Sequence, residues 1–307
     1  MKESIPRRVG PSISIHSRGV MTNAPTARIP PTKRGTQRGK VSGWSAKSRM
    51  RLRRYLLMHE PAQDSIEGNL TLTIPGDPVS VDQMRSLWKL FCREVQRRGW
   101  SMVWRMEVQK RGQPHWHCVL TLPDAHTVQH DPMARLLAWD QCRRLWLRCL
   151  DSLGPVTWTG YLPEARTSGT FDLQSRSDIP QAYVRGFNLQ IEDSESENRW
   201  AWRRYLQDHA SKAKQEQIAE GFGRHWGVVG RGRYKLVTPQ EVVRLNDAEY
   251  FRVVRWLQRM VSGMTKCSKA PFGSKRGYRQ RRGTHGKSVW FSNPATVSRL
   301  ISLALQS

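Results

Sequence analysis

The chain has 307 residues, enough for one large domain or two smaller ones. Its 51 Lys and Arg residues against 25 Asp and Glu give a formal net charge of +26, and self-repulsion on that scale calls for a polyanionic partner, with nucleic acid as the leading candidate. Five cysteines without a CxxC pair argue against a disulfide framework and a zinc ribbon, and no apolar run is long enough for a transmembrane helix, so we expect an intracellular protein with no membrane partner.

The first 60 residues are among the most basic parts of the chain. They hold 14 Lys or Arg residues and only two acids, Glu3 and Glu60, with Pro, Gly, Ser and Thr between them. Low hydrophobicity with high net charge is typical of disorder, so residues 1–60 are expected to form a disordered basic arm, with a short helix at 47–60. This arm and the basic stretch 263–287 would hold phosphates without sequence preference; the alternative is a tail that serves solubility.

Ordered structure is expected to begin near residue 68. The sequence "LTLTIP" at 70–75 alternates apolar residues with threonine, which predicts a strand with one apolar face. A helix follows over 81–98, because apolar residues recur there with helical spacing. Ser80 or Asp82 can cap its first turn, and Gly99 ends it.

Residues 104–122 ("WRMEVQKRGQPHWHCVLTL") predict two strands joined by a tight turn. A three-residue loop at 110–112, with Gly112 in the left-handed conformation, is a common hairpin connection. Such a loop pairs odd positions with odd positions, so Glu107 lies across from His115. The two faces of the hairpin then differ in chemistry. The polar face holds Glu107, Gln109, His115 and His117, and the apolar face holds Trp104, Met106, Val108, Trp116, Cys118 and Leu120.

The rest of the chain alternates between helices and strands. The expected elements are a helix at 134–150, a strand within 172–193, a helix at 198–221, a glycine-rich turn into a strand at 221–235 and a helix at 238–262. This order predicts an α+β fold, in which a central antiparallel sheet has helices packed on one face and an open catalytic face on the other. Residues 65–235 would form that domain, and residues 236–307 a helical and basic C-terminal extension.

The polar face of the hairpin brings two imidazoles and one carboxylate together. Glu107, His115 and His117 make a three-ligand set with open positions left over, which is the shape of a catalytic rather than a structural metal site. Mixed nitrogen and oxygen ligation suits Mn²⁺, and Mg²⁺ is the alternative by abundance. The competing interpretation is that these are surface residues satisfied by local hydrogen bonds.

These segments resemble the motifs of the HUH endonuclease superfamily, and within it the rolling-circle replication initiators (Rep) of small phages and plasmids. The hairpin is similar to the second motif of that family, in which two histidines flank one bulky residue. The strand at 70–75 is similar to the first motif, and "YLQDHASKAKQ" at 205–215 is similar to the third, a helix that carries a nucleophilic tyrosine. The resemblance covers about residues 68–232 and implies a ferredoxin- or RRM-like HUH nuclease domain.

The resemblance also implies a reaction. Tyr205 would attack a phosphodiester of single-stranded DNA at a replication origin, leaving a 5′-phosphotyrosine and a free 3′-OH that primes rolling-circle synthesis. A divalent metal on Glu107, His115 and His117 would act as the Lewis acid. Lys212, seven positions after Tyr205 and on the same helix face, would stabilise the developing charge.

The third motif departs from the family form at two positions. Asp208 stands where the family has a lysine, and His209 stands where it has a second tyrosine. The chain would therefore be a single-tyrosine enzyme, in which Lys212 or Lys214 replaces the missing lysine.

No nucleotide cofactor is expected, because "GTHGKS" at 283–288 is preceded by Arg281 where a phosphate-binding loop needs glycine. Strand opening and synthesis would then fall to a host helicase and polymerase in the cytoplasm of a bacterial cell. Two other interpretations stay open. One is a relaxase or single-strand transposase of the same superfamily, of which the relaxase fits less well because its tyrosine lies near the N-terminus. The other is a non-catalytic nucleic-acid-binding protein with a degenerate site.

Overall fold

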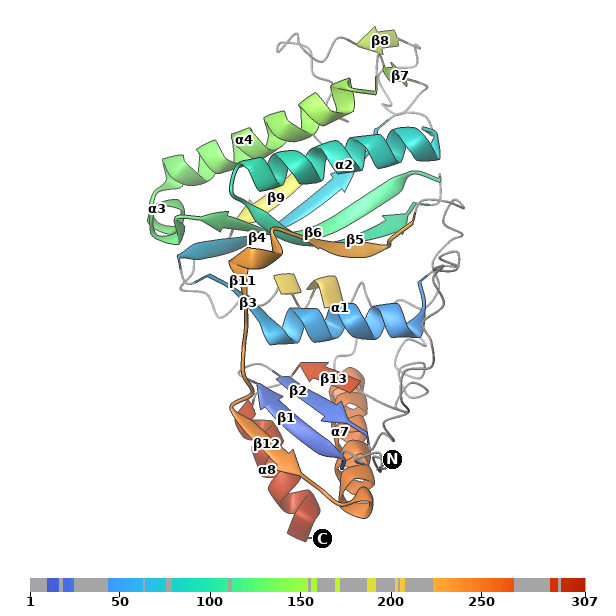
Figure 1. The fold of residues 1–307 in the computed structure, drawn as a ribbon, viewed down its shortest axis with the longest axis vertical. Coiled ribbons are helices and arrows are strands. Elements are labelled where there is room, and N and C mark those ends of the chain that lie inside the picture. The colour runs from blue at the N-terminus through green and yellow to red at the C-terminus, as the bar shows by residue number, and fades with distance from the viewer. Residues whose placement is uncertain are drawn as a thin grey trace, which may run out of the picture. The chain divides into compact units, whose positions relative to one another are not determined.

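The computed structural model describes residues 10–16, 19–24, 44–62, 64–75, 79–109, 112–153, 156–158, 169–171, 187–191, 202–203, 205–207, 223–267, 288–291 and 294–306. The chain divides into two compact units. We call residues 40–45 and 61–235 the central unit, and residues 1–39, 46–60 and 236–307 the terminal unit, because both ends of the chain contribute to it. Figure 1 shows the elements of each.

The central unit is built on a five-stranded antiparallel sheet. Its strands are β4 (Ser65–Thr73), β5 (Ser101–Val108), β6 (Pro114–Pro123), β9 (Phe187–Ile191) and β10 (Trp226–Val229), in the order β10-β5-β6-β4-β9. The helices are α2 (Val81–Arg97), α3 (Ala125–His130) and α4 (Pro132–Asp151), and a separate ladder joins β7 (Val156–Trp158) to β8 (Gly169–Phe171). The expected α+β fold with a central antiparallel sheet is confirmed.

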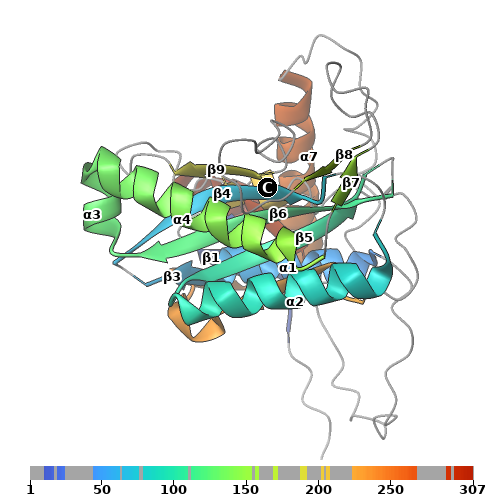
Figure 2. The same cartoon turned by 90° about the horizontal axis from the view of Figure 1, so that it is seen from above.

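Helix α2 follows its sequence signals. The Ser80 hydroxyl accepts from the Gln83 backbone N–H, and the Gln83 side chain accepts from the Ser80 N–H, a capping box that satisfies two donors at the helix start. Gly99, with φ of +70°, ends the helix as predicted. Figures 1 and 2 show α2 and α4 over the same face of the sheet. There the Trp88 ring of α2 stacks on Trp116 of β6 at 4.7 Å, so the apolar face of the hairpin forms the core.

Helix α4 packs mainly through its C-terminal two thirds. Its fully buried residues begin at Ala138 and include Leu145 and Leu150. Leu136 and Leu137, which the sequence pattern also places on the packed face, are 56% and 54% exposed because they precede this contact.

The opposite, polar face of the sheet is covered at several positions where the sequence predicted an open face. Glu67 of β4, Arg105 of β5 and His117 of β6 are 5%, 0% and 3% exposed. Their partners come from outside the sheet strands, and they include Trp44 and Arg203. The site on this face is therefore an enclosed polar layer with a limited opening.

The terminal unit has a four-stranded sheet in the order β12-β1-β2-β13. The strands are β1 (Ser12–His16), β2 (Gly19–Asn23), β12 (Glu241–Arg244) and β13 (Ser288–Phe291), and the helices are α1 (Ala46–Met58), α7 (Asp247–Cys267) and α8 (Pro294–Gln306). The remaining short strands of the chain are β3 (His59–Pro61) and β11 (Tyr234–Leu236). Buried residues from both ends of the chain form the core, namely Ile13, Ile15, Val20, Leu245, Tyr250, Val253, Val254, Leu257 and Ile301.

This unit differs from the disordered arm expected for residues 1–60. Strands β1 and β2 and helix α1 lie within that range. The physical reason is local alternation: Ile13 and Ile15 point into the core, and the average composition of a lysine- and arginine-rich segment conceals this pattern. At the other end, strand β12 precedes α7, where the sequence predicted one helix over 238–262. No helix in the described part of the chain is long and apolar enough to cross a membrane.

His16 at the end of β1 makes the terminal unit sensitive to acid. Its side chain is 1% exposed, and neither ring nitrogen has a hydrogen-bond partner among the described residues. Burial and the charge of Arg54 lower the pKa of His16, while Glu60 opposes them. The unfolded chain therefore takes up this proton first, below about pH 6.5. We expect the unfolding free energy of the terminal unit to fall as pH drops below that value.

Urea unfolding at pH 7.5 and at pH 5.5 tests this expectation. His16→Leu should reduce the difference between the two free energies by up to about 1.4 kcal/mol per pH unit below the unfolded pKa. His130→Leu is the control, because the His130 side chain is exposed. An equal pH dependence in the parent and in His16→Leu would contradict the assignment.

Candidate active site

The β5–β6 hairpin has the predicted register. The Gln109 N–H donates to the Gln113 carbonyl oxygen at 2.8 Å, so three residues separate the last paired positions. Gly112 has φ of +83°, in the left-handed region. Glu107 is paired directly with His115. The register expected from the loop length is confirmed.

The three predicted ligands lie together on the polar face. The ring centroids of His115 and His117 are 4.4 Å apart. The Nε2 atom of His117 lies 3.7 Å from Oε2 of Glu107. Gln109, which shares this face, lies with Nε2 at 3.5 Å from Nδ1 of His115.

Two residues that the sequence analysis did not single out complete the cluster. Arg105 is opposite His117 in the ladder, and its Nη1 lies 2.7 Å from Oε1 of Glu107. Thr73 of β4 is opposite His115, with Oγ1 at 2.6 Å from Nδ1 of that ring. The odd-to-odd parity that paired Glu107 with His115 also places Arg105 on this face. Thr73 needed the β4–β6 pairing, which joins distant parts of the chain.

Tyr205 reaches this cluster from outside the sheet. Residues 205–207 are helical, and the Tyr205 hydroxyl lies 3.5 Å from Nδ1 of His117, with the two ring centroids 5.6 Å apart. The next residue, Leu206, is buried, whereas Tyr205 itself is 36% exposed. The phenol therefore faces the two histidines and the carboxylate while remaining open to a substrate.

The hairpin and the preceding strand and helix also carry the likeness to known proteins. Residues 68–153 match the model of the replication-associated protein family named for ORF2. This is a family of rolling-circle replication initiators, and the resemblance expected from the sequence motifs is confirmed over these residues. Comparisons with curated proteins and with solved structures gave no match.

A divalent metal is the cofactor that the initiator resemblance implies, and the cluster fits it in part. Atoms 3.7 Å apart, as Nε2 of His117 and Oε2 of Glu107 are, can both ligate one cation at about 2.1 Å. With protons on Nδ1, both histidines keep a lone pair on Nε2, and Thr73 and Tyr205 lie beside the Nδ1 atoms, as partners of metal-binding histidines do. The donor set is thus chemically suitable.

The fit is incomplete in the geometry found. Among the described residues, no group of three or more His, Cys, Asp or Glu side chains is arranged to hold a metal ion. Arg105 takes one oxygen of Glu107, which accounts for part of this difference. The three-ligand site on Glu107, His115 and His117 stays a prediction.

The electrostatics of the cluster keep Tyr205 protonated. Burial raises the pKa of the Tyr205 phenol, and the negative charge of Glu107 raises it further. The hydroxyl therefore carries its proton at neutral pH, and its activation requires positive charge nearby. Lys212 and the alternative Lys214 lie outside the described residues, as do Asp208 and His209.

Proposed function

We propose that this chain is a replication initiator that nicks single-stranded origin DNA, with Tyr205 as the nucleophile. The observation that supports it most is the Tyr205 hydroxyl, 3.5 Å from His117, in a chain whose residues 68–153 match a family of rolling-circle replication initiators. A tyrosine in a helix needs no such neighbour to fold. Its approach to two histidines and a carboxylate on one sheet face matches the nucleophile of a phosphoryl transfer.

The reaction balances as a transesterification. The Tyr205 oxygen attacks the scissile phosphorus, the bond from phosphorus to the 3′ oxygen breaks, and the phenolic proton is in net terms transferred to that oxygen. The products are a 5′-phosphotyrosine and a free 3′-OH.

Each residue of the cluster has a part in this proposal. His117 orients the phenolic oxygen through Nδ1, Glu107 and the two Nε2 atoms would hold Mn²⁺ or Mg²⁺, and Lys212 would stabilise the departing charge. A bound cation would supply Lewis-acid polarisation of the phosphate. Host helicase and polymerase would open and copy the strand inside the cell.

The test is a covalent adduct. The protein is incubated with single-stranded oligonucleotides carrying origin sequence and with Mn²⁺, and the products are separated on a denaturing gel. Label at the 3′ end of the DNA should move with the protein, and label at the 5′ end should be released with the free 3′-OH. The opposite pattern of labels would contradict the proposed chemistry. A single-strand transposase would form the same adduct on transposon-end sequence, and the absence of any adduct would favour a non-catalytic nucleic-acid-binding protein.

The distribution of charge between the two units supports a DNA partner. The terminal unit has 26 Lys and Arg residues against five Asp and Glu, whereas the central unit has 25 against 20. The net charges are therefore +21 and +5, which together give the +26 of the chain. Helix α1 alone carries five basic residues and no acid. We propose that the terminal unit binds DNA phosphates without sequence preference while the central unit cleaves.

Exposed cations of α1 provide a measurable consequence. Lys47→Gln with Arg51→Gln should weaken duplex DNA binding and reduce the slope of log K against log salt by about 0.9 for each phosphate that the variant no longer neutralises. Fluorescence anisotropy at several salt concentrations measures the slope. The matched control is Arg85→Gln with Lys89→Gln on α2, which removes two exposed cations from the central unit. Equal changes in both double variants would contradict a special role of the terminal unit.

A further inference from the structure

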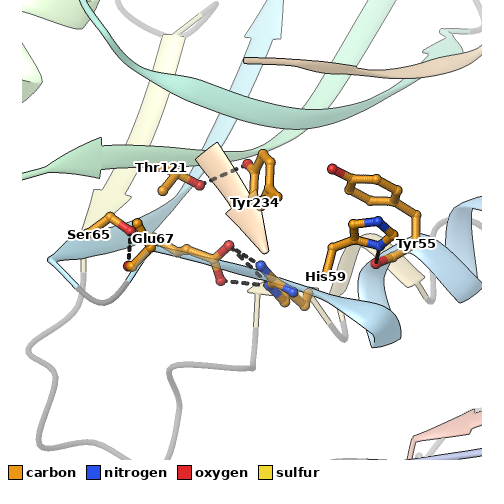
Figure 3. Close-up of polar contacts among 8 residues, drawn as sticks. Tyr55, His59, Ser65, Glu67, Thr121 and Tyr234 are labelled. Atoms are coloured by element: carbon orange, nitrogen blue, oxygen red, sulfur yellow. Dashed lines mark hydrogen bonds and ion pairs between the residues drawn. The ribbon is translucent and has the colours of Figure 1, made fainter. Parts of the chain in front are cut away.

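A buried ion pair joins the Tyr205 segment to the sheet. Arg203 donates from Nε to Oε2 of Glu67 at 2.7 Å and from Nη2 to Oε1 at 2.6 Å, the paired geometry that a guanidinium and a carboxylate form best. The side chains of Arg203 and Glu67 are 1% and 2% exposed. Figure 3 shows the Glu67 carboxylate in this contact.

The pair is closed in by further polar groups of the central unit. The Tyr234 hydroxyl shares a hydrogen bond of 2.9 Å with Oγ1 of Thr121, which is adjacent to Glu67 in the β4–β6 ladder. Tyr234 is itself buried, and burial together with the charge of Glu67 raises its pKa, so it stays neutral. The only full charges that these contacts place here are therefore those of Arg203 and Glu67, which gives each charge a strong reason to keep the other.

Such a pair costs desolvation and adds little net stability, but it permits few geometries. That property matters because of where the pair lies. Glu67 precedes Thr71, the ladder partner of His117, by four residues, or about 13 Å along β4. The helical segment is therefore held at one point by Arg203, and it touches His117 at a second point through Tyr205. Two separated contacts fix the direction of a short helical segment, whereas the Tyr205 contact alone would leave it free to rotate.

We propose that the Arg203–Glu67 ion pair is the positioning device that sets the Tyr205 hydroxyl against His117. Neither residue touches the reacting atoms, so both act through Tyr205. The catalytic consequence rests on the proposed nicking function, while the placement of Tyr205 does not depend on it.

The placement can be read without any activity. Tyr205 is replaced by 3-fluorotyrosine, and its ¹⁹F resonance is recorded in the full chain. Arg203→Met should move the resonance toward that of a solvent-exposed fluorotyrosine or broaden it, because the segment loses its second point of attachment. Arg85→Met is the matched control, since Arg85 pairs with Asp82 on the exposed surface of α2. It should leave the resonance unchanged.

The kinetic result distinguishes positioning from general weakening of the fold. Arg203→Met should lower the rate constant of adduct formation by about a hundredfold with saturating oligonucleotide, while the Kd for the oligonucleotide changes less than about twofold. Arg203→Lys keeps the charge but loses the fork, so its rate constant should lie between those of the parent and Arg203→Met.

One further variant keeps the test decisive if a single substitution prevents folding. Glu67→Leu with Arg203→Met removes both charges and leaves no unpaired ion in the interior, so this double variant should fold. An unchanged ¹⁹F resonance in either folded variant would overturn the proposal. A resonance that responds in a chain whose parent forms no adduct would support the positioning and refute the nicking function instead.

Discussion

A Tyr205→Phe variant is expected to lose the covalent protein–DNA adduct, with the rate reduced by on the order of a thousandfold or more. The substitution removes only the hydroxyl oxygen, the atom that would bond to phosphorus. The ring that packs edge-on against His117 at 5.6 Å is retained, and the side chain is 36% exposed, so the fold should be unaffected. The measurement is the yield of adduct over time on a denaturing gel, with thermal unfolding recorded beside it.

Tyr250→Phe is the matched control for this result. Tyr250 belongs to the terminal unit and is 1% exposed, so its hydroxyl is closed to DNA. Its loss should leave the adduct intact. If the adduct persisted in Tyr205→Phe, the nucleophile would be another tyrosine, and Tyr161, Tyr183 and Tyr278, which lie outside the described residues, would be the next to test.

The part of the site that sequence could predict is the part governed by short-range rules. A three-residue connection and strict alternation place Glu107 opposite His115 without knowledge of any other strand. The same parity places Arg105 beside them, so a signal for this residue was present in the sequence, although a search for metal ligands does not select an arginine. Helix α2 was likewise predictable, because its capping box and the terminating Gly99 are local features.

Contacts between distant segments could not be predicted in this way. Glu67 and Arg203 are 136 positions apart, and nothing in either neighbourhood specifies the other. Similarly, β1 pairs Ser12 with Arg244, which draws both ends of the chain into one unit. A composition that averages to disorder over 60 residues can still contain a short alternating strand that becomes stable only when a remote partner is present.

Arg105→Met is expected to have the second largest effect, and it acts in two opposite directions. The Arg105 side chain is fully buried, its Nη1 lies 2.7 Å from Oε1 of Glu107, and its guanidinium lies 4.8 Å from the centre of the Trp44 ring. Methionine fills much of the volume but leaves Glu107 without this cation. Because Glu107 is still 17% exposed, we expect a loss of about 3 kcal/mol in the free energy of unfolding, at the lower end of the range for a broken buried pair.

The same change should strengthen the binding of a divalent cation. Arg105 neutralises the carboxylate that the cation would use, so its removal returns the full negative charge of Glu107 to the site. The rise in Tm that Mn²⁺ produces should therefore be larger in Arg105→Met than in the parent, by the ordinary linkage between binding and stability. Arg98→Met is the matched control, because Arg98 pairs with Glu94 on the surface of α2 and its loss should cost less than about 1 kcal/mol. If Mn²⁺ stabilised neither the parent nor Arg105→Met, the cluster would not be a metal site, and Arg105 would be the permanent counter-ion of Glu107.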